Sequence, residues 1–172
     1  MKDFLKMLKA MLRKLAAALG FTLLAGGCDK DATLPPISKL PTVTMRVGAK
    51  IYNLEIAATE PMQQLGLMRR NSMPADHGMI FVFPDERDRG FWMKDVRFGL
   101  FIVFMDHDGR VVSTAHMRSY DQTTTPSNGP IQYAIELNDD QEQACGVKPG
   151  DVLVIPAAAQ APASQPQATG AH

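Results

Sequence analysis

Residues 78–109, GMIFVFPDERDRGFWMKDVRFGLFIVFMDHDG, decide the fold. This stretch holds two nearly continuous apolar runs, at 78–83 and 100–105, separated by a charged loop and the only tryptophan of the chain. Continuous apolar runs of this length are typical of strands that are buried on both faces. Asp108-Gly109 is the usual signal of a tight hairpin turn. We therefore expect the stretch to form the buried sheet of one small domain.

Working outward, the flanking segments also predict short strands and only two helices. Thr59, Glu60 and Pro61 are typical of a helix start, and Gly66 should end that helix. Asn138 should cap a second helix over 139–145. The polar segment 118–130 is expected to be an exposed loop. Further strands are predicted at 42–47, 51–57, 91–94, 110–117, 131–137 and 151–155. This density of short strands favours an α+β, mostly β domain, a compact antiparallel barrel- or sandwich-like fold with two short helices.

The charge distribution argues against a nucleic-acid partner. The whole chain of 172 residues has a formal net charge of zero, but the first 27 residues carry five basic residues against one acid. Residues 28–172 therefore hold 13 basic and 17 acidic residues, a net charge of −4. A mildly acidic domain lacks the basic footprint that binding to a phosphate backbone requires. We expect no binding to nucleic acid.

The amino-terminal stretch is typical of an export signal. Residues 1–14 are basic, and the apolar run at 15–25 is far shorter than the ~20 residues that span a bilayer as a helix. Small residues then precede Cys28 in the sequence Leu-Ala-Gly-Gly-Cys, which resembles the lipobox of bacterial lipoproteins, whose cysteine is acylated. The alternative is an ordinary cleaved signal followed by a chance cysteine.

The lipoprotein resemblance implies a membrane anchor at Cys28. Three acyl chains hold a protein on a bilayer, whereas one chain binds only marginally. Asp29 resembles the signal for inner-membrane retention in enterobacterial lipoproteins, which slightly favours the inner membrane. We therefore expect an exported protein of the bacterial cell envelope, on the periplasmic face of a membrane. The predicted organisation is a signal peptide at 1–27, the lipidated cysteine and a Pro-rich tether at 28–42, a globular domain at 43–156 and a disordered tail at 157–172.

Several ordered motifs resemble the bacterial family called domain of unknown function 192. The resemblance covers about residues 43–155 and implies a small, largely β, α+β domain that is often exported, without implying an activity. This chain departs from the family pattern at Asp95, where asparagine is usual, and at Gly99-Leu100-Phe101, where Pro-Leu-Asp is usual. The motifs are GLMRR at 66–70, GMIFVF at 78–83, FWMKD at 91–95, YAIEL at 133–137 and GD at 150–151.

One surface is predicted to bind a ligand. Trp92 and Lys94 share strand parity, so they should lie on one face while Phe91 and Met93 point into the core. Arg69, Arg70 and Asp95 could complete a polar rim. An aromatic ring beside a cation suits an anionic or sugar ligand. The alternative is that Trp92 packs under a loop while the Lys94 stem lies along the surface with its ammonium in water.

Other chemistry is represented by weaker patterns. Cys145 has no partner if Cys28 is acylated, and we interpret it as a small buried hydrophobic residue. Thioether sulfur suits Cu(I), and Met73, His77 and Met79 lie close in sequence, although methionine usually fills gaps in a core. The turn at 106–109 lacks the further ligands of a calcium loop. The chain contains none of the common serine-hydrolase, zinc-protease or phosphate-loop motifs.

Three hypotheses of function follow from these patterns. The leading one is a membrane-tethered periplasmic module without catalysis and without a cofactor, which binds a small molecule or an envelope protein through Trp92, Lys94, Asp95, Arg69 and Arg70. An alternative is a hydrolase of cell-envelope polymers, which needs a cleft with a perturbed acid such as Glu136 or Asp95. A second alternative is Cu(I) or other metal handling through methionine and histidine.

Overall fold

The structure, a computed structural model, describes residues 40–160. The predicted signal peptide, the acylated Cys28, nearly all of the tether and most of the tail lie outside the described residues. Within 40–160, no helix is long and apolar enough to cross a membrane.

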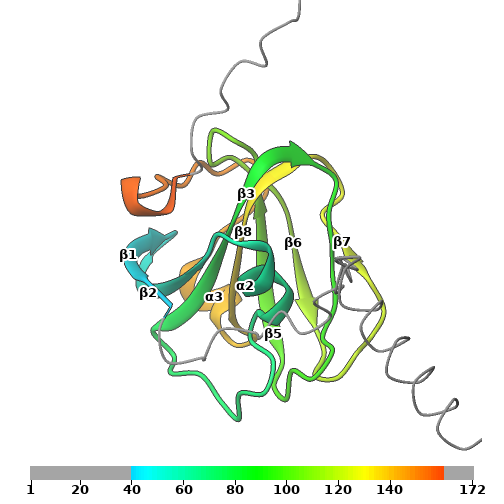
Figure 1. Cartoon of the computed structure of the whole chain (residues 1–172). Coiled ribbons are helices and arrows are strands. Elements are labelled where there is room, and N and C mark those ends of the chain that lie inside the picture. The colour runs from blue at the N-terminus through cyan, green and yellow to red at the C-terminus, as the bar shows by residue number, and fades with distance from the viewer. Residues whose placement is uncertain (1–39, 161–172) are drawn as a thin grey trace, which may run out of the picture. The chain divides into compact units, whose positions relative to one another are not determined.

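A six-stranded sheet forms the centre of the domain (Figure 1). Its strand order is β1-β2-β3-β8-β5-β6, so the two apolar runs of the central stretch, β3 and β5, lie on either side of β8. β5 is buried along its whole length, as its continuous apolar sequence predicts. The strands are β1 (Thr42–Val47), β2 (Lys50–Ala57), β3 (His77–Arg87), β5 (Leu100–Met105), β6 (Val111–Met117) and β8 (Ile131–Asn138).

The sheet is open and mixed, which corrects the prediction of an antiparallel barrel while agreeing with the sandwich-like alternative. β1 and β6 are its two edges, so the sheet does not close. β2 and β3 pair in parallel, whereas every other pair in the sheet is antiparallel. Parallel neighbours need a crossover connection, and the helix α2 (Glu60–Leu65) with the segment after it supplies one.

A second, two-stranded sheet pairs β4 (Gly90–Phe91) with β7 (Thr125–Pro126). The segment 118–130 is therefore more than the exposed loop that its polarity predicts, and it includes the fully buried Ser127. The strand predicted at 91–94 ends at Phe91, because the chain turns at Lys94. The strand predicted at 151–155 is reduced to a single bridge between Arg110 and Val152.

Three short helical segments complete the described residues. α2 ends before Gly66, as predicted. The second helix, α3 (Gln141–Cys145), begins later than predicted and follows Asp140 rather than Asn138, because Asn138 still belongs to β8. The 3₁₀ helix η2 (Ala157–Ala159) lies where the sequence predicts the start of the tail, and Ala159 is buried in the core.

The sheet has two different faces, because successive residues of each strand point to opposite sides. One face, which we call the closed face, packs against α3 and the carboxy-terminal segment. The other, which we call the open face, packs against Met62 of α2 and the segments around Leu67 and Phe91. The closed face includes Tyr52, Ile80, Val82, Phe101, Val103, Ile135 and Leu137. The open face includes Met79, Phe81, Phe83, Ile102, Phe104 and Ala134.

Candidate functional site

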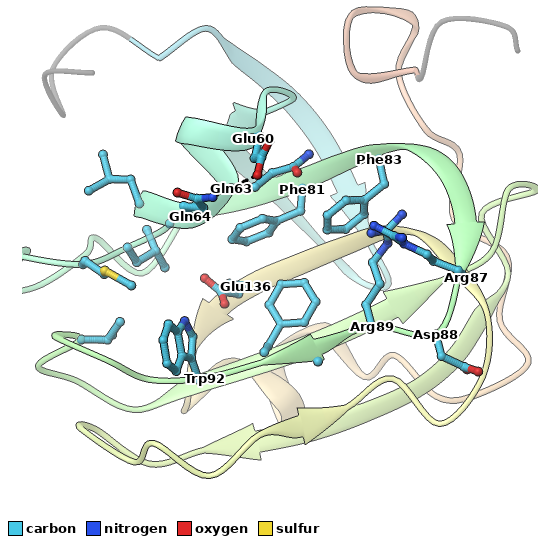
Figure 2. Close-up of a pocket in the computed structure, with 17 residues that line it drawn as sticks. Glu60, Gln63, Gln64, Phe81, Phe83, Arg87, Asp88, Arg89, Trp92 and Glu136 are labelled. Carbon is cyan, nitrogen blue, oxygen red and sulfur yellow. Dashed lines mark hydrogen bonds between the residues drawn. The ribbon is translucent and has the colours of Figure 1, made fainter. Parts of the chain in front are cut away.

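A pocket of about 490 Å³ opens on the open face of the sheet (Figure 2). The helix α2, the second half of β3 and the segment from Gly90 to Val96 surround it, and β8 contributes one residue at its base. A volume of this size is ordinary for a small-molecule site. The charged, amide and aromatic residues that line it are Glu60, Gln63, Gln64, Phe81, Phe83, Arg87, Asp88, Arg89, Phe91, Trp92 and Glu136.

Three phenylalanine rings form an apolar wall. Phe81 and Phe83 lie two residues apart on β3 and therefore face the same side of the sheet. Phe91, from β4, meets the Phe81 ring edge-on at a centroid distance of 5.1 Å and the Phe83 ring at 6.3 Å. Edge-to-face contacts of this kind hold rings in fixed orientations. The wall is therefore a shaped surface that a flat apolar group can contact.

Glu136 is the acidic group in the buried part of the pocket. It lies on β8 between Met79 of β3 and Ile102 of β5, and it is only 5% exposed. No hydrogen bond joins its carboxyl group to any residue in the described range. Burial raises the pKa of Glu136 to about 8, while the positive charge of Arg70 opposes that shift. At neutral pH the group is therefore mainly a neutral acid, which can donate one hydrogen bond and accept others.

Arg70 lies on the segment that follows α2 and pairs with a residue in the same row of the sheet as Glu136. Its guanidinium binds Glu55 through two parallel hydrogen bonds, of 2.5 and 2.7 Å, and the Arg70 Nε has no partner in the described part of the chain. Glu55 of β2 is in register with Met79, which is in register with Glu136. Arg70 therefore acts on the base of the pocket through its charge instead of completing a surface rim.

Arg87, Arg89 and Asp85 form a charged cluster at one end of the pocket. The Arg89 Nη2 donates to the Asp85 Oδ1 at 2.6 Å, and the Arg87 Nε lies 3.4 Å from the Asp85 Oδ2. The Arg89 side chain is 9% exposed and lies over the Phe83 ring at 3.7 Å. Burial lowers the pKa of Arg89, and the pairing with Asp85 lowers the pKa of that carboxyl.

The predicted surface residues are found in the loop segments beside this pocket. Phe91 and Met93 are buried while Trp92 and Lys94 are exposed, as strand parity predicts. The Lys94 Nζ lies 5.4 Å from the centre of the Trp92 ring. Trp92 itself lines the pocket and is half exposed.

Arg69 and Asp95 are joined through the backbone. The Arg69 N–H donates to the Asp95 carbonyl at 3.0 Å, and both residues have positive φ angles, 64° and 56°. Such angles are uncommon outside glycine, so the two residues mark a tightly constrained pair of turns. Both are exposed. The structure thus brings Trp92, Lys94, Asp95 and Arg69 into one region but separates Arg70 from it.

Most of the pocket is not predictable from the sequence alone. The pattern predicts a buried strand for Phe81 and Phe83 and a charged loop for Arg89, and it gives no sign that these side chains meet. Glu136 was named only as a possible perturbed acid. A signal was available in the segment 131–137, where one acid stands among apolar residues of a strand that is expected to be buried.

Six methionines of the described range lie in the core, whereas Met62 and Met68 are partly buried. Met73 and Met79 belong to the open-face cluster, and Met45 and Met105 to the closed-face cluster. The His77 Nδ1 pairs with its neighbour Asp76 at 2.8 Å. Cu(I) handling stays a prediction that these contacts do not support. Cys145 is buried at the end of α3, as expected for a small apolar residue.

Fold and pocket together define a small mixed-sheet domain with one face closed and one face hollowed. A family model covers residues 42–155, and the chain therefore belongs to the DUF192 family, described as uncharacterized ACR. The search of curated proteins found no significant match.

Two solved structures are similar to this chain. A putative transcription regulator from Sinorhizobium meliloti 1021 is 28% identical, with a TM-score of 0.65, and the match covers 67% of this chain and 95% of that one. A protein of unknown function from Novosphingobium aromaticivorans DSM 12444 is 32% identical, with a TM-score of 0.63, and the match covers 71% of this chain and 91% of that one. The matches support the domain fold.

Proposed function

We propose that this DUF192 protein is a non-catalytic binding module of the cell envelope, tethered to a membrane, and that its pocket holds a small molecule. The observation that carries the proposal is Glu136, a residue only 5% exposed, whose carboxyl group has no hydrogen-bond partner among the described residues and borders a pocket of about 490 Å³. Buried polar groups are nearly always paired, because an unpaired one loses its hydration without compensation. A ligand that bonds to Glu136 would supply the missing partner.

The pocket offers a ligand both contact area and orientation. The phenylalanine wall and Trp92 give apolar surface, while Gln63, Arg89 and Glu136 give polar groups at separate points. This combination, mainly apolar walls with a few placed polar groups, is typical of small-molecule sites. Trp92 is half exposed, so it would cover a bound molecule from the solvent side, with Lys94 beside it and Asp95 and Arg69 as further rim residues.

The cellular location rests on the amino-terminal sequence. The basic start, the short apolar run and the small residues before Cys28 support export followed by acylation. Labelling cells with a radioactive fatty acid tests this directly: the protein should be labelled, and Cys28→Ser should abolish the label and release the protein from membranes. Unchanged membrane association of the unlabelled variant would refute the tether.

A thermal-shift screen of the full chain tests the binding function. Sugars, nucleotides, peptidoglycan fragments, small organic acids and Cu(I) are suitable probes. A ligand at 100 times its dissociation constant stabilises the folded state by ~2.7 kcal/mol, which is several degrees for a domain of this size. Met68→Trp, which fills the pocket from a lining position, should abolish the shift. Ile51→Trp, at an exposed position away from the pocket, should preserve it. A shift that survives Met68→Trp would place the ligand elsewhere.

A second candidate is a hydrolase of cell-envelope polymers with Glu136 as general acid. The observation that favours it is the pKa of about 8, because a general acid must keep its proton near neutral pH. Glu60 lines the same pocket and is exposed, so it could supply a second carboxyl group. Turnover of labelled envelope fragments would support this candidate if Glu136→Gln abolished turnover while binding persisted. Absence of turnover from fragments that do bind would exclude it.

Transcription regulation, which the name of the Sinorhizobium structure suggests for that protein, has weaker support here. Residues 28–172 carry four more acidic than basic residues, and an acidic domain is repelled by the phosphate backbone. The basic residues at the pocket, Arg87 and Arg89, are both paired with Asp85.

A further inference from the structure

Two polar groups stand at different ends of the pocket with the phenylalanine wall between them. Figure 2 shows the guanidinium groups of Arg87 and Arg89 next to Phe83, and the Glu136 carboxyl displaced from them toward Trp92. A ligand that satisfies both ends must therefore be extended and carry a different chemical group at each end.

The arginine end contains two guanidinium groups, Arg87 and Arg89, and Asp88 lines the same end. A single carboxylate, Asp85, is shared by two guanidinium groups. The Arg89 side chain is nine-tenths buried, and its buried Nε has no hydrogen-bond partner within residues 40–160. A guanidinium that is removed from water and only partly paired favours a second anion, because charge-assisted hydrogen bonds to carboxylates are the strong ones.

The Glu136 end favours a hydrogen-bond acceptor. A neutral carboxylic acid offers an O–H donor, and the side chains of its register neighbours, Met79 and Ile102, supply no acceptor stronger than a thioether sulfur. A cationic group would bind Glu136 only in its ionised form, and it would be repelled by the arginine end. The charged groups around Glu136 are Arg70, which acts on it directly, and Glu60, Arg87, Asp88 and Arg89, which line the same pocket.

We propose that the ligand is a small aromatic acid: its anionic group binds at Arg89, its ring lies against Phe81, Phe83 and Phe91, and an acceptor oxygen at its far end takes the hydrogen bond of Glu136. This inference rests on the proposed binding function and names its ligand class. A planar ring suits the wall, because the three phenylalanine rings already contact one another at fixed angles.

Three para-substituted acetophenones of similar size test the charge of the ligand. Titration calorimetry of the full chain would compare 4-acetylbenzoate, neutral 4-acetylbenzamide and cationic 4-(aminomethyl)acetophenone. The carboxylate should bind at least tenfold more tightly than the amide, and the amine should bind most weakly. An amine that binds as tightly as the carboxylate would overturn the inference.

The pH dependence tests the Glu136 end. Affinity for 4-acetylbenzoate should fall about tenfold from pH 7 to pH 9, because the neutral form of Glu136 is then a minority. No histidine lines the pocket, so no other lining group with an ordinary pKa near 7 titrates in that range. Glu136→Gln keeps a donor at the same place and should bind with an affinity that does not change with pH. A wild-type affinity that is flat over this range would overturn the role of Glu136.

Two variants with opposite expected effects test the arginine end. Arg89→Gln should remove the preference for carboxylate over amide, and the exposed Arg46→Gln on β1 is its control. Asp85→Asn frees both guanidinium groups and should tighten carboxylate binding, a gain that misfolding cannot produce. Unchanged affinity in both pocket variants would overturn the assignment.

Different results would refute the small-molecule function of the pocket and the aromatic-acid class of its ligand. If a neutral or cationic compound from the broader screen binds and Met68→Trp abolishes it, the pocket function stands and the acid inference falls. If the three aromatic probes and the whole screen leave the melting temperature unchanged, the proposed small-molecule function falls with the inference.

Discussion

The two faces of one sheet are covered in different ways. On the closed face, α3, η2 and the carboxy-terminal segment fill the space, and the polar groups are paired: Gln141 accepts hydrogen bonds from the Tyr52 hydroxyl at 3.1 Å and from the Lys50 Nζ at 2.6 Å. On the open face, one short helix and loops leave a pocket with Glu136 at its base. The same strands thus build a packed core on one side and a site on the other.

The filled closed face mainly stabilises the fold, whereas the hollowed open face carries the candidate site. A paired polar group under a filled layer, such as Gln141, fixes the position of α3. An unpaired carboxyl under an incomplete layer costs stability, and strongly perturbed titratable groups in clefts cluster at functional sites. Variants on the two faces should therefore behave differently.

The largest effect is expected from loss of a closed-face ring. Phe101→Ala removes a fully buried side chain and should lower the free energy of unfolding by ~3–5 kcal/mol. Phe91→Ala on the open face should cost roughly half as much, because part of that ring already borders the pocket. Urea unfolding followed by circular dichroism measures both. Equal losses would mean that the open face is as tightly packed as the closed one.

The next effect is the pH dependence that Glu136 imposes. Its pKa is raised from 4.5 to about 8, so between these values the unfolded chain has released a proton that the folded chain keeps. The free energy of unfolding should therefore fall as pH rises through this window, by up to ~1.4 kcal/mol per unit from this group. Glu136→Gln should remove that slope and be the more stable protein at pH 8. Parallel pH profiles for the two proteins would contradict an unpaired buried carboxyl.

A smaller effect of opposite sign is expected at Tyr52. Tyr52→Phe removes one hydrogen bond to Gln141, which keeps its bond from Lys50, and should cost ~1 kcal/mol. Burial raises the pKa of Tyr52 to about 12, so this loss should be constant between pH 5 and 8. Chemical denaturation at several pH values compares it with Glu136→Gln. A stabilising Tyr52→Phe would remove the contrast between the faces.

The smallest effect is expected at the edge of the closed face. His116 of β6 pairs through its two ring nitrogens with Asp139 and Glu142, and these partners raise the pKa of the imidazole. The stabilisation is fully present below pH 6.5 and is lost as pH rises through the raised pKa. Because the groups are exposed, His116→Gln should cost less than ~1 kcal/mol at pH 6 and almost nothing at pH 9. Titration by NMR would show whether the pKa is raised.

The sequence predicted the strands better than their pairing. The apolar runs at 78–83 and 100–105 became β3 and β5, and the motif at 59–66 became α2, because each depends on local pattern and capping. The parallel pairing of β2 with β3 was not predictable in this way, since it follows from where α2 returns the chain. β7 was missed because its two residues form a strand only against Gly90 and Phe91.

The candidate site was predictable only in part. The alternation of side chains along a strand correctly predicted that Trp92 and Lys94 are exposed. It could not show that Trp92 borders a pocket, because the residue at the base of that pocket, Glu136, lies 44 positions later in the sequence. The sequence suggests one rim for Arg69 and Arg70 because the two residues are adjacent. Adjacent side chains can nevertheless point in different directions. Arg70 binds Glu55 and Arg69 stays exposed.

The sequence by itself determined the apolar strands, the turns and the acidic balance of the domain, because each of these is a property of local sequence and composition. Only the tertiary structure decided that one face is filled and the other hollowed. That outcome depends on which segments cover each face, and α3 with the carboxy-terminal residues covers one more completely than α2 covers the other. The raised pKa of Glu136 follows from this arrangement, since a carboxyl group acquires it only where distant strands exclude water.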